Sequence, residues 1–264
     1  METDLTRLGH SLVLTEEQDL GVVMQSGVWH SDPDNGDFYA VGRVLSHKSY
    51  HVEVLKTVLK SSLNPAKGMD ISFIENGRFL LKFFHSVDRD RVLASGPWTF
   101  EKNLVVLAPV SDTDDPAEVD LSFCDFHVRI HGLPLGKMTS DIASFIGGKV
   151  DRLKDFDLSK GPESWGSFMR LRVALDVTKP LPRALKLRTV LGDEHIVTFS
   201  YERLPNFWYL CGRSGHISQW CDSRFLPNFV DPGANSLFGP WLREVTRVDS
   251  KTHFPQHSSL QSNS

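Results

Sequence analysis

Two cysteines and one histidine toward the carboxyl end of the chain have the types and spacing of metal ligands. Four residues separate Cys211 from His216, and four more separate His216 from Cys221. Thiolate sulfur and imidazole nitrogen are the common ligands of tetrahedral zinc, and very short loops bring them to one ion. Glycines follow Cys211 and precede His216, where tight turns can point backbone N–H groups at sulfur. The segment therefore predicts metal chemistry.

The spacing matches a zinc knuckle, Cys-x2-Cys-x4-His-x4-Cys, except at its first position, which holds Trp208. An indole nitrogen only donates hydrogen bonds and cannot bind zinc. Three ligands remain, and water, Asp222 or a side chain from a partner would have to complete the shell. We therefore expect weak zinc binding by Cys211, His216 and Cys221, since a lost thiolate removes much of the binding energy. The alternative is two metal-free thiols and a surface histidine, with Trp208 packing in place of the ligand.

Aromatic and basic side chains surround this spacing. Trp208, Tyr209 and Trp220 have the flat apolar rings on which unpaired bases stack, and Arg213 adds a positive charge. These four residues are candidate contacts for RNA or single-stranded DNA. The competing use of the rings is packing on the small knuckle itself.

Arg170 and Arg172 are the other candidate nucleic-acid contacts. They alternate with apolar residues in the strand pattern from Met169 to Val177, so both face away from its apolar side. In an RNA-recognition fold such a central strand faces the nucleic acid. The alternatives are a solvated sheet face or one that is covered by a helix.

Residues 36–110 carry an alternating order of strand and helix patterns. Asn64-Pro65 and Gly96-Pro97 end the two helices, and Asn76-Gly77 is a strong hairpin signal. The expected elements are a strand at 40–45, a helix at 52–59, strands at 69–73 and 79–84, a helix capped by Ser86 and a strand at 104–107. This order, β-α-β-β-α-β, is the ferredoxin-like arrangement shared with the RNA-recognition motif.

A similar order of elements is expected again after residue 127. The expected elements are a strand at 126–130, a helix capped by Thr139 and closed by Gly147-Gly148, strands at 150–156 and 169–177, a weak helix at 182–187 and a strand at 195–201. We find no convincing repeat of the sequence itself. The segment Gly77–Phe84 resembles the RNA-binding strand signature but lacks its second small residue, so its aromatic rings are expected in the core. Trp98 and Cys124 are expected there too.

Charge divides the chain further. The net charge is −4, but residues 1–35 hold seven acidic residues and one arginine, and residues 111–127 hold six acidic residues and no Lys or Arg. The segments 36–110 and 128–199 are mildly basic. The expected division is an acidic arm at 1–35, a ferredoxin-like domain at 36–110, an acidic linker at 111–127, a second α/β module at 128–203, a degenerate knuckle at 204–225 and a mostly disordered tail at 226–264. Charge alone neither requires a polyanion partner nor excludes one.

Several function classes find no support in the sequence. Three cysteines argue against a disulfide framework, and no apolar run reaches the roughly 18 residues that span a bilayer. The polar start of the chain is not a signal peptide. Phosphate-cradling loops, nucleophile elbows and His-Glu-x-x-His motifs are absent. We therefore expect an intracellular protein, nuclear or cytoplasmic, that is not an enzyme and does not contact a membrane.

A series of short segments, taken in order, resembles a known family. The segments are Ser11–Glu17, Val41–Leu45, Arg91–Leu93, Gly96–Phe100, Val128–Pro134, Tyr201–Phe207 and Phe238–Arg243. The chain resembles plant LINE-type retrotransposon proteins in which a domain of unknown function precedes a CCHC zinc knuckle. That resemblance implies nucleic-acid and zinc binding, with Cys211, His216 and Cys221 as ligands and Trp208 in the place of the first.

The sequence thus predicts an α+β protein with a ferredoxin-like domain, a second, smaller α/β module and a degenerate zinc-knuckle tail. The predicted function is binding of single-stranded RNA or DNA, with zinc as a weak cofactor. The alternative is a decayed or domesticated protein-interaction module that binds neither nucleic acid nor zinc; its protein partners are not indicated.

Overall fold

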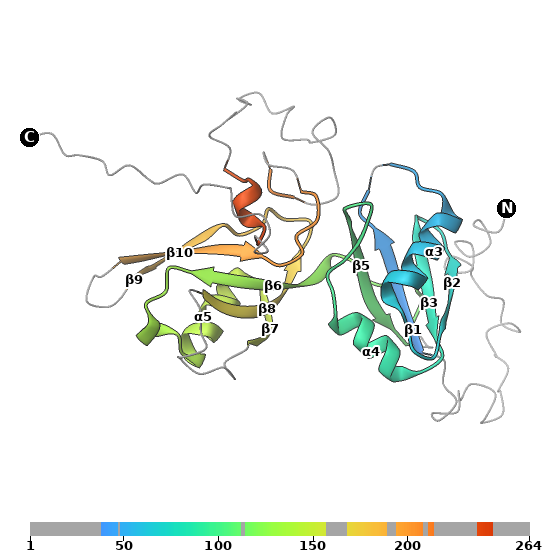
Figure 1. Cartoon of the computed structure of the whole chain (residues 1–264), viewed down its shortest axis with the longest axis horizontal. Coiled ribbons are helices and arrows are strands. Elements are labelled where there is room, and N and C mark those ends of the chain that lie inside the picture. The colour runs from blue at the N-terminus through green and yellow to red at the C-terminus, as the bar shows by residue number, and fades with distance from the viewer. Residues whose placement is uncertain are drawn as a thin grey trace, which may run out of the picture. The chain divides into compact units, whose positions relative to one another are not determined.

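Two five-stranded antiparallel sheets follow one another along the chain (Figure 1). The computed structural model describes residues 38–46, 48–111, 114–156, 168–188, 194–207, 211–213 and 237–244. The acidic arm at 1–35 lies outside these residues. No helix in the described ranges is both long and apolar enough to cross a membrane.

The first sheet has the predicted order of elements, with one strand added. Its elements are β1 (Phe38–Val44), α3 (Val52–Leu63), β2 (Met69–Phe73), β3 (Arg78–Phe83), α4 (Ser86–Ala94), β4 (Trp98–Phe100) and β5 (Asn103–Val110). Hydrogen bonding arranges the strands as β2-β3-β1-β5-β4. Without the short β4, this is the strand order of the ferredoxin-like fold. The added β4 pairs with β5 as a hairpin.

Local chemistry explains most boundaries of this sheet. Asn64 ends α3 in the left-handed conformation, with φ of 42°. Asn76 and Gly77 both have positive φ, 59° and 69°, as a tight hairpin turn requires. The predicted N-cap was wrong by one residue. Ser86 is the first residue of α4, and His85 caps the helix because its Nδ1 accepts the Val87 N–H at 3.1 Å.

The second sheet has the same strand order as the first. Its elements are β6 (Phe123–His131), the 3-10 turn η1 (Leu135–Lys137), α5 (Ser140–Val150), β7 (Arg152–Phe156), β8 (Phe168–Asp176), β9 (Ala184–Arg188) and β10 (Glu194–Tyr201). The order β7-β8-β6-β10-β9 corresponds, strand for strand, to that of the first sheet. The predicted repeat is therefore confirmed for the strands, with β9 in the place of β4, but no helix corresponding to α4 lies between β8 and β9.

One predicted helix and two predicted boundaries in the second sheet were wrong. Residues 182–187 do not form a helix, because Ala184–Arg188 pair with β10 as an edge strand. The strand β6 begins at Phe123, so the acidic linker ends before residue 127. The helix α5 continues past Gly147-Gly148 to Val150, since Gly147 is buried against Leu153. The predicted cap of this helix is confirmed, with Thr139 Oγ1 accepting the Ile142 N–H at 3.4 Å.

Each sheet buries one face against its helices. Leu55, Leu59 and Leu63 of α3 and Val92 of α4 pack on Phe79, Leu81 and Phe83 of β3, as Figure 1 shows for the helices over the first sheet. The rings of Phe79 and Phe83 thus lie in the core, as expected, whereas Phe84, also expected there, lies just past the end of β3 and is 52% exposed. In the second sheet, Ala143, Ile146 and Val150 of α5 belong to the cluster that holds the apolar side chains of β6, β8 and β10.

The chain returns to the second sheet after the knuckle segment. Leu242 in the 3-10 turn η5 (Pro240–Leu242) is fully buried, and Phe238 is nearly so. Arg243 forms a parallel bridge with Tyr201, and the Glu244 N–H bonds the Tyr201 carbonyl at 3.1 Å. The prediction of a mostly disordered tail at 226–264 did not include this packing. The apolar run Phe238-Gly239-Pro240-Trp241-Leu242 causes it.

Candidate functional site

Polar side chains line the face of the second sheet that its helix leaves uncovered. Along β6 the buried residues alternate with His127, Arg129 and His131, and along β8 they alternate with Phe168, Arg170 and Arg172. The two strands are adjacent and antiparallel, with Arg129 opposite Arg170 and His131 opposite Phe168. Ser200 on β10 lies opposite Arg129. We call these seven residues the polar face.

Phe168 is the centre of an aromatic and cationic stack on the polar face. The Arg129 guanidinium lies 4.1 Å from the centroid of the Phe168 ring, and the His131 ring lies 5.7 Å away. His131 Nε2 is 2.8 Å from Ser200 Oγ, which fixes the direction of the imidazole. Burial, with a smaller effect of Arg129, lowers the pKa of His131, so the ring is uncharged at neutral pH.

Glu202 holds two arginines of the polar face in place. Its Oε1 accepts hydrogen bonds from Arg129 Nε at 2.8 Å and Arg170 Nε at 2.9 Å, and its Oε2 accepts one from Arg170 Nη2 at 2.7 Å. Burial by itself would raise the pKa of Glu202. The hydrogen bonds and charges of Arg170 and Arg129 outweigh that effect and lower the pKa to about 2. The carboxylate therefore stays ionised throughout the physiological range.

Two further carboxylates, those of Glu244 and Asp125, form ion pairs with Arg129 and Arg172. Glu244, brought back by the segment after the knuckle, forms an ion pair with Arg129. Burial raises the pKa of Glu244 above its usual value, although Arg129 opposes this shift. Arg172 Nη2 donates to Asp125 Oδ2 at 2.7 Å. Burial, followed by the charge of Arg170, lowers the pKa of His127 as well.

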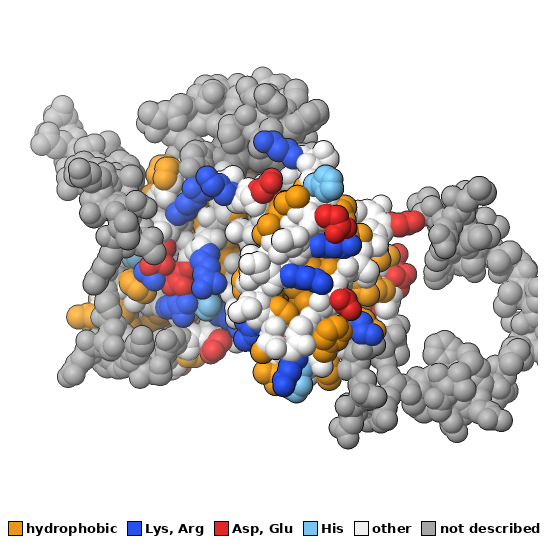
Figure 2. Space-filling model, turned by 45° about the vertical axis from the view of Figure 1, so that its right-hand side comes forward, with side chains coloured by type: hydrophobic (Ala, Val, Ile, Leu, Met, Phe, Trp, Pro, Cys, Tyr) orange, Lys and Arg blue, Asp and Glu red, His pale blue; other side chains and the backbone are white. Residues whose placement is uncertain are grey.

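The polar face therefore carries little net charge. Three arginines face three carboxylates, and both histidines are uncharged at neutral pH. Basic and acidic side chains also lie among one another on the side of the molecule that Figure 2 presents. A phosphate group would reach these guanidiniums only by competing with the carboxylates that already bind them.

The first sheet also has a face that α3 and α4 leave uncovered, but that face is buried by apolar packing. Val41, Leu104, Val106 and Val110 are buried there, in one cluster with Leu121 of the linker. Arg78 Nη1 fixes the linker by donating to the carbonyl oxygens of Pro116 and Val119, at 3.0 and 2.7 Å. Of the two sheets, the second is therefore the one that presents polar and aromatic groups.

The structure describes only the beginning of the predicted zinc site. Cys211 is buried, and the Gly212 carbonyl accepts the Leu181 N–H at 3.0 Å. A side chain at Gly212 would meet the Phe238 ring, so the segments on both sides of the knuckle pack together. Arg213 is exposed. Trp208, Tyr209, His216, Trp220 and Cys221 lie outside the described residues, and within those residues no group of three or more potential ligands occurs.

Sequence reasoning found part of this site. It identified Arg170 and Arg172, which the structure places on the polar face. It missed Arg129, His131 and Phe168, although the alternation along β6 contained the signal for the first two. Glu202 and Glu244 lie outside the strands that carry the face, and no local pattern connects them to it.

In comparisons with known proteins, two segments of the chain match protein families. Residues 36–118 match a family described as "Domain of unknown function (DUF4283)", and residues 175–223 match one described as "Zinc knuckle". The chain therefore contains a DUF4283 region followed by a zinc knuckle region of the CCHC type. The zinc knuckle match begins within β8, so it includes β9 and β10. The search of curated proteins found no match.

A solved structure also matches over much of the chain. The crystal structure of the first two RRM domains of yeast poly(U) binding protein (Pub1) has 13% sequence identity and a TM-score of 0.22. The match covers 62% of this chain and 98% of that chain. The relation to the RNA-recognition arrangement depends on the strand orders of the two sheets.

Proposed function

We propose that this protein binds single-stranded RNA or DNA through the polar face of its second sheet, together with the knuckle segment. The observation that carries the proposal is the stack of Arg129 and His131 around Phe168 on the two central strands. RNA-recognition sheets stack bases on aromatic residues of their central strands, and this sheet has the same strand order. The zinc knuckle match in the adjoining segment supports the same function.

Binding would exchange one set of ion pairs for another. A backbone phosphate replaces Glu202 or Glu244 as the partner of Arg129 or Arg170, while a base stacks beside Phe168. Because the arginines are already oriented, little side-chain entropy is lost on binding. Because the carboxylates compete, we expect moderate affinity without strong preference for sequence.

We further propose that the protein derives from a retrotransposon, acts inside the cell and has no catalytic role. The order of a DUF4283 region and a zinc knuckle region supports the first point. Zinc binding would be weak, with Cys211, His216 and Cys221 as its ligands. The second candidate function is a protein-interaction module, and the pairing of every arginine on the polar face with a carboxylate favours it.

The test is fluorescence anisotropy of labelled single-stranded RNA and DNA with the full chain, from about 50 to about 200 mM salt. Phosphates at Arg129 and Arg170 are two contacts, which predict a loss of about sevenfold in affinity over this range, because bound counterions are released on binding. Phe168→Leu removes the ring and keeps an apolar side chain, and it should weaken binding by about 1–3 kcal/mol. Glu202→Gln removes a competing carboxylate and should strengthen binding at low salt.

The matched control is Lys149→Ala, which removes an exposed cation from α5, on the other side of the sheet. It should leave affinity within about twofold, whereas Arg170→Ala should weaken binding to all sequences alike. Circular dichroism confirms that each variant is folded. No binding to any single strand at low salt would reject the proposal in favour of the interaction module.

A further inference from the structure

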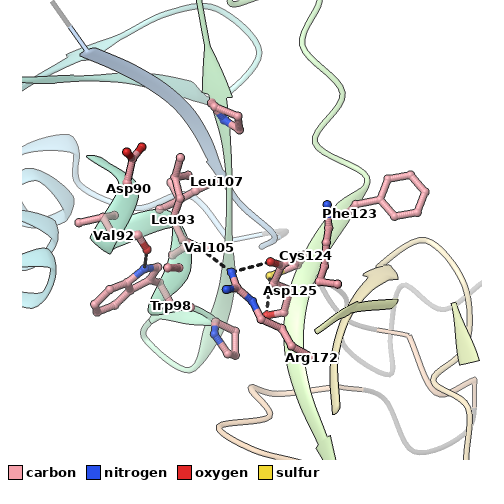
Figure 3. Close-up of a pocket in the computed structure, with 15 residues that line it drawn as sticks. Asp90, Val92, Leu93, Trp98, Val105, Leu107, Phe123, Cys124, Asp125 and Arg172 are labelled. Carbon is pink, nitrogen blue, oxygen red and sulfur yellow. Dashed lines mark hydrogen bonds and ion pairs between the residues drawn. The ribbon is translucent and has the colours of Figure 1, made fainter. Parts of the chain in front are cut away.

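A cavity of about 340 Å³ lies beside the end of α4, apart from the Phe168 stack. Its walls come from α4, from the β4–β5 hairpin and from β6, β7 and β8 of the second sheet (Figure 3). Cavities that hold small organic ligands in proteins start at about 300 Å³. The cavity is therefore large enough for one ligand of the size of a nucleobase.

The walls of this cavity are mostly apolar and include two aromatic residues, Trp98 and Phe123. Leu93, Pro97, Trp98 and Leu107 line it. The Trp98 Nε1–H donates to the Val92 carbonyl at 2.8 Å, which fixes the plane of the indole (Figure 3). Cys124 also lines the cavity, but burial raises the pKa of its thiol to about 12, so it stays protonated and unreactive. These walls suit a flat and uncharged ring.

Two basic side chains supply polar contacts in the cavity. Arg172 Nη2 donates to Asp125 Oδ2 at 2.7 Å and lies 3.5 Å from the Leu93 carbonyl, as the dashed lines in Figure 3 show. Its Nε is buried and has no hydrogen-bond partner among the described residues. The side chain as a whole lines the cavity and is 27% exposed, so its accessible N–H groups can donate to an acceptor on a ligand. Lys154 also lines the cavity, is exposed, and has no ion pair within the described ranges.

We propose that this cavity takes one unstacked nucleobase, with its ring beside Trp98, its acceptor atoms toward Arg172 and its phosphate at Lys154. The inference extends the proposed nucleic-acid binding and rests on it. The ring, the acceptors and a single anionic group are the shared chemistry of a free nucleotide and of one residue in a strand. The strand is the expected source, because the Phe168 stack would bind a neighbouring part of it.

The test is photo-cross-linking of the full chain to an oligouridine that contains 4-thiouridine, with the cross-linked peptides mapped by mass spectrometry. We expect cross-links to the peptide that contains Trp98 and, separately, to the peptide that contains Phe168. Ala94→Trp fills the cavity from an exposed position, and Lys154→Ala removes the phosphate contact. Each should reduce cross-linking at Trp98 about tenfold and leave that at Phe168 unchanged. The control Lys149→Ala should change neither.

The possible outcomes separate this inference from the proposed function. Cross-links at Phe168 alone, with binding intact, would overturn the cavity site and leave the polar face as the interface. Absence of all binding and cross-linking would overturn both. Competition by uridine monophosphate distinguishes the two sources. If millimolar mononucleotide removes the Trp98 cross-link and leaves the Phe168 cross-link, the cavity binds a free nucleotide as well as a strand.

Discussion

At the scale of single residues, hydrogen bonds and ion pairs hold the charged side chains of the polar face in place. Glu202 accepts three hydrogen bonds from Arg129 and Arg170, and Ser200 fixes His131. Ion pairs that are half-buried gain strength from exclusion of water but lose the hydration of both groups. Their clearest contribution is therefore orientation, because they point two guanidiniums along one face before any ligand arrives.

His131 makes the stability of this face depend on pH. Its folded-state pKa is lowered by burial, so the unfolded chain binds the proton more readily. The free energy of unfolding should therefore fall as pH decreases from about 7.5 to about 5.5, through the ordinary pKa range of histidine. His131→Gln keeps a polar partner for Ser200. It should reduce the slope of the free energy of unfolding against pH by an amount that corresponds to at most one bound proton. Urea unfolding at several pH values measures the slope, and exposed His51→Gln is the control. A slope that His131→Gln leaves unchanged would contradict the prediction.

Trp208 should limit zinc binding. It stands where a knuckle has its first thiolate, and four ligands together give about 10–16 kcal/mol of apparent binding free energy in zinc-finger peptides. Trp208→Cys should tighten binding of cobalt, the spectroscopic substitute for zinc, by about a hundredfold or more. The thiolate-to-cobalt absorption band of the full chain measures this. Trp220→Cys adds a thiol at the wrong spacing and should not have this effect. Equal affinity of the wild type and Trp208→Cys would show that Trp208 is not disabling.

At the scale of elements, sequence patterns predicted the strands and helices whose causes are local. The positive φ angles at Asn76-Gly77, the left-handed Asn64 and the Thr139 cap all follow from the chemistry of one or two residues. The errors arose where distant packing decides. Gly147 does not end α5, because Leu153 packs against it, and 184–188 becomes a strand because β10 offers an edge to pair with. Glu202 and Glu244 reach the site for the same kind of reason, through contacts distant in sequence.

Gly132, which follows the end of β6, has a backbone conformation in which any other residue is strained. Its φ is +84°, and a Cβ there would lie 2.9 Å from the Ile196 carbonyl oxygen, a backbone atom that cannot move aside. Gly132→Ala should therefore reduce stability by about 1–3 kcal/mol. Gly136→Ala, four residues later, meets no atom within 4 Å and should stay within about 0.5 kcal/mol. Thermal unfolding of both variants compares them, and equal stability would show that the turn relaxes without cost.

At the scale of the whole molecule, the two sheets share a strand order but differ on the face that lies away from their helices. The first sheet buries Val41, Val106 and Val110 on that face, while the second presents His127, Arg129 and Phe168. One arrangement of strands thus serves packing in one module and exposes polar groups in the other. The residues that alternate along the central strands therefore decide which sheet presents polar groups, and strand order alone does not.

The acidic arm at residues 1–35 should compete with nucleic acid for the basic groups of the chain. It holds seven acidic residues and one arginine, so it is a tethered polyanion at high local concentration. Its deletion should raise affinity for a single strand several-fold at low salt. At physiological ionic strength the effect should shrink, because exposed charges are screened beyond about 8–10 Å. Anisotropy titrations of the full and shortened chains at several salt concentrations measure this difference. A chain in which the seven acidic residues are changed to Asn or Gln separates charge from length, since it should behave like the deletion. If affinity at low salt is the same in all three chains, the arm does not reach the basic groups.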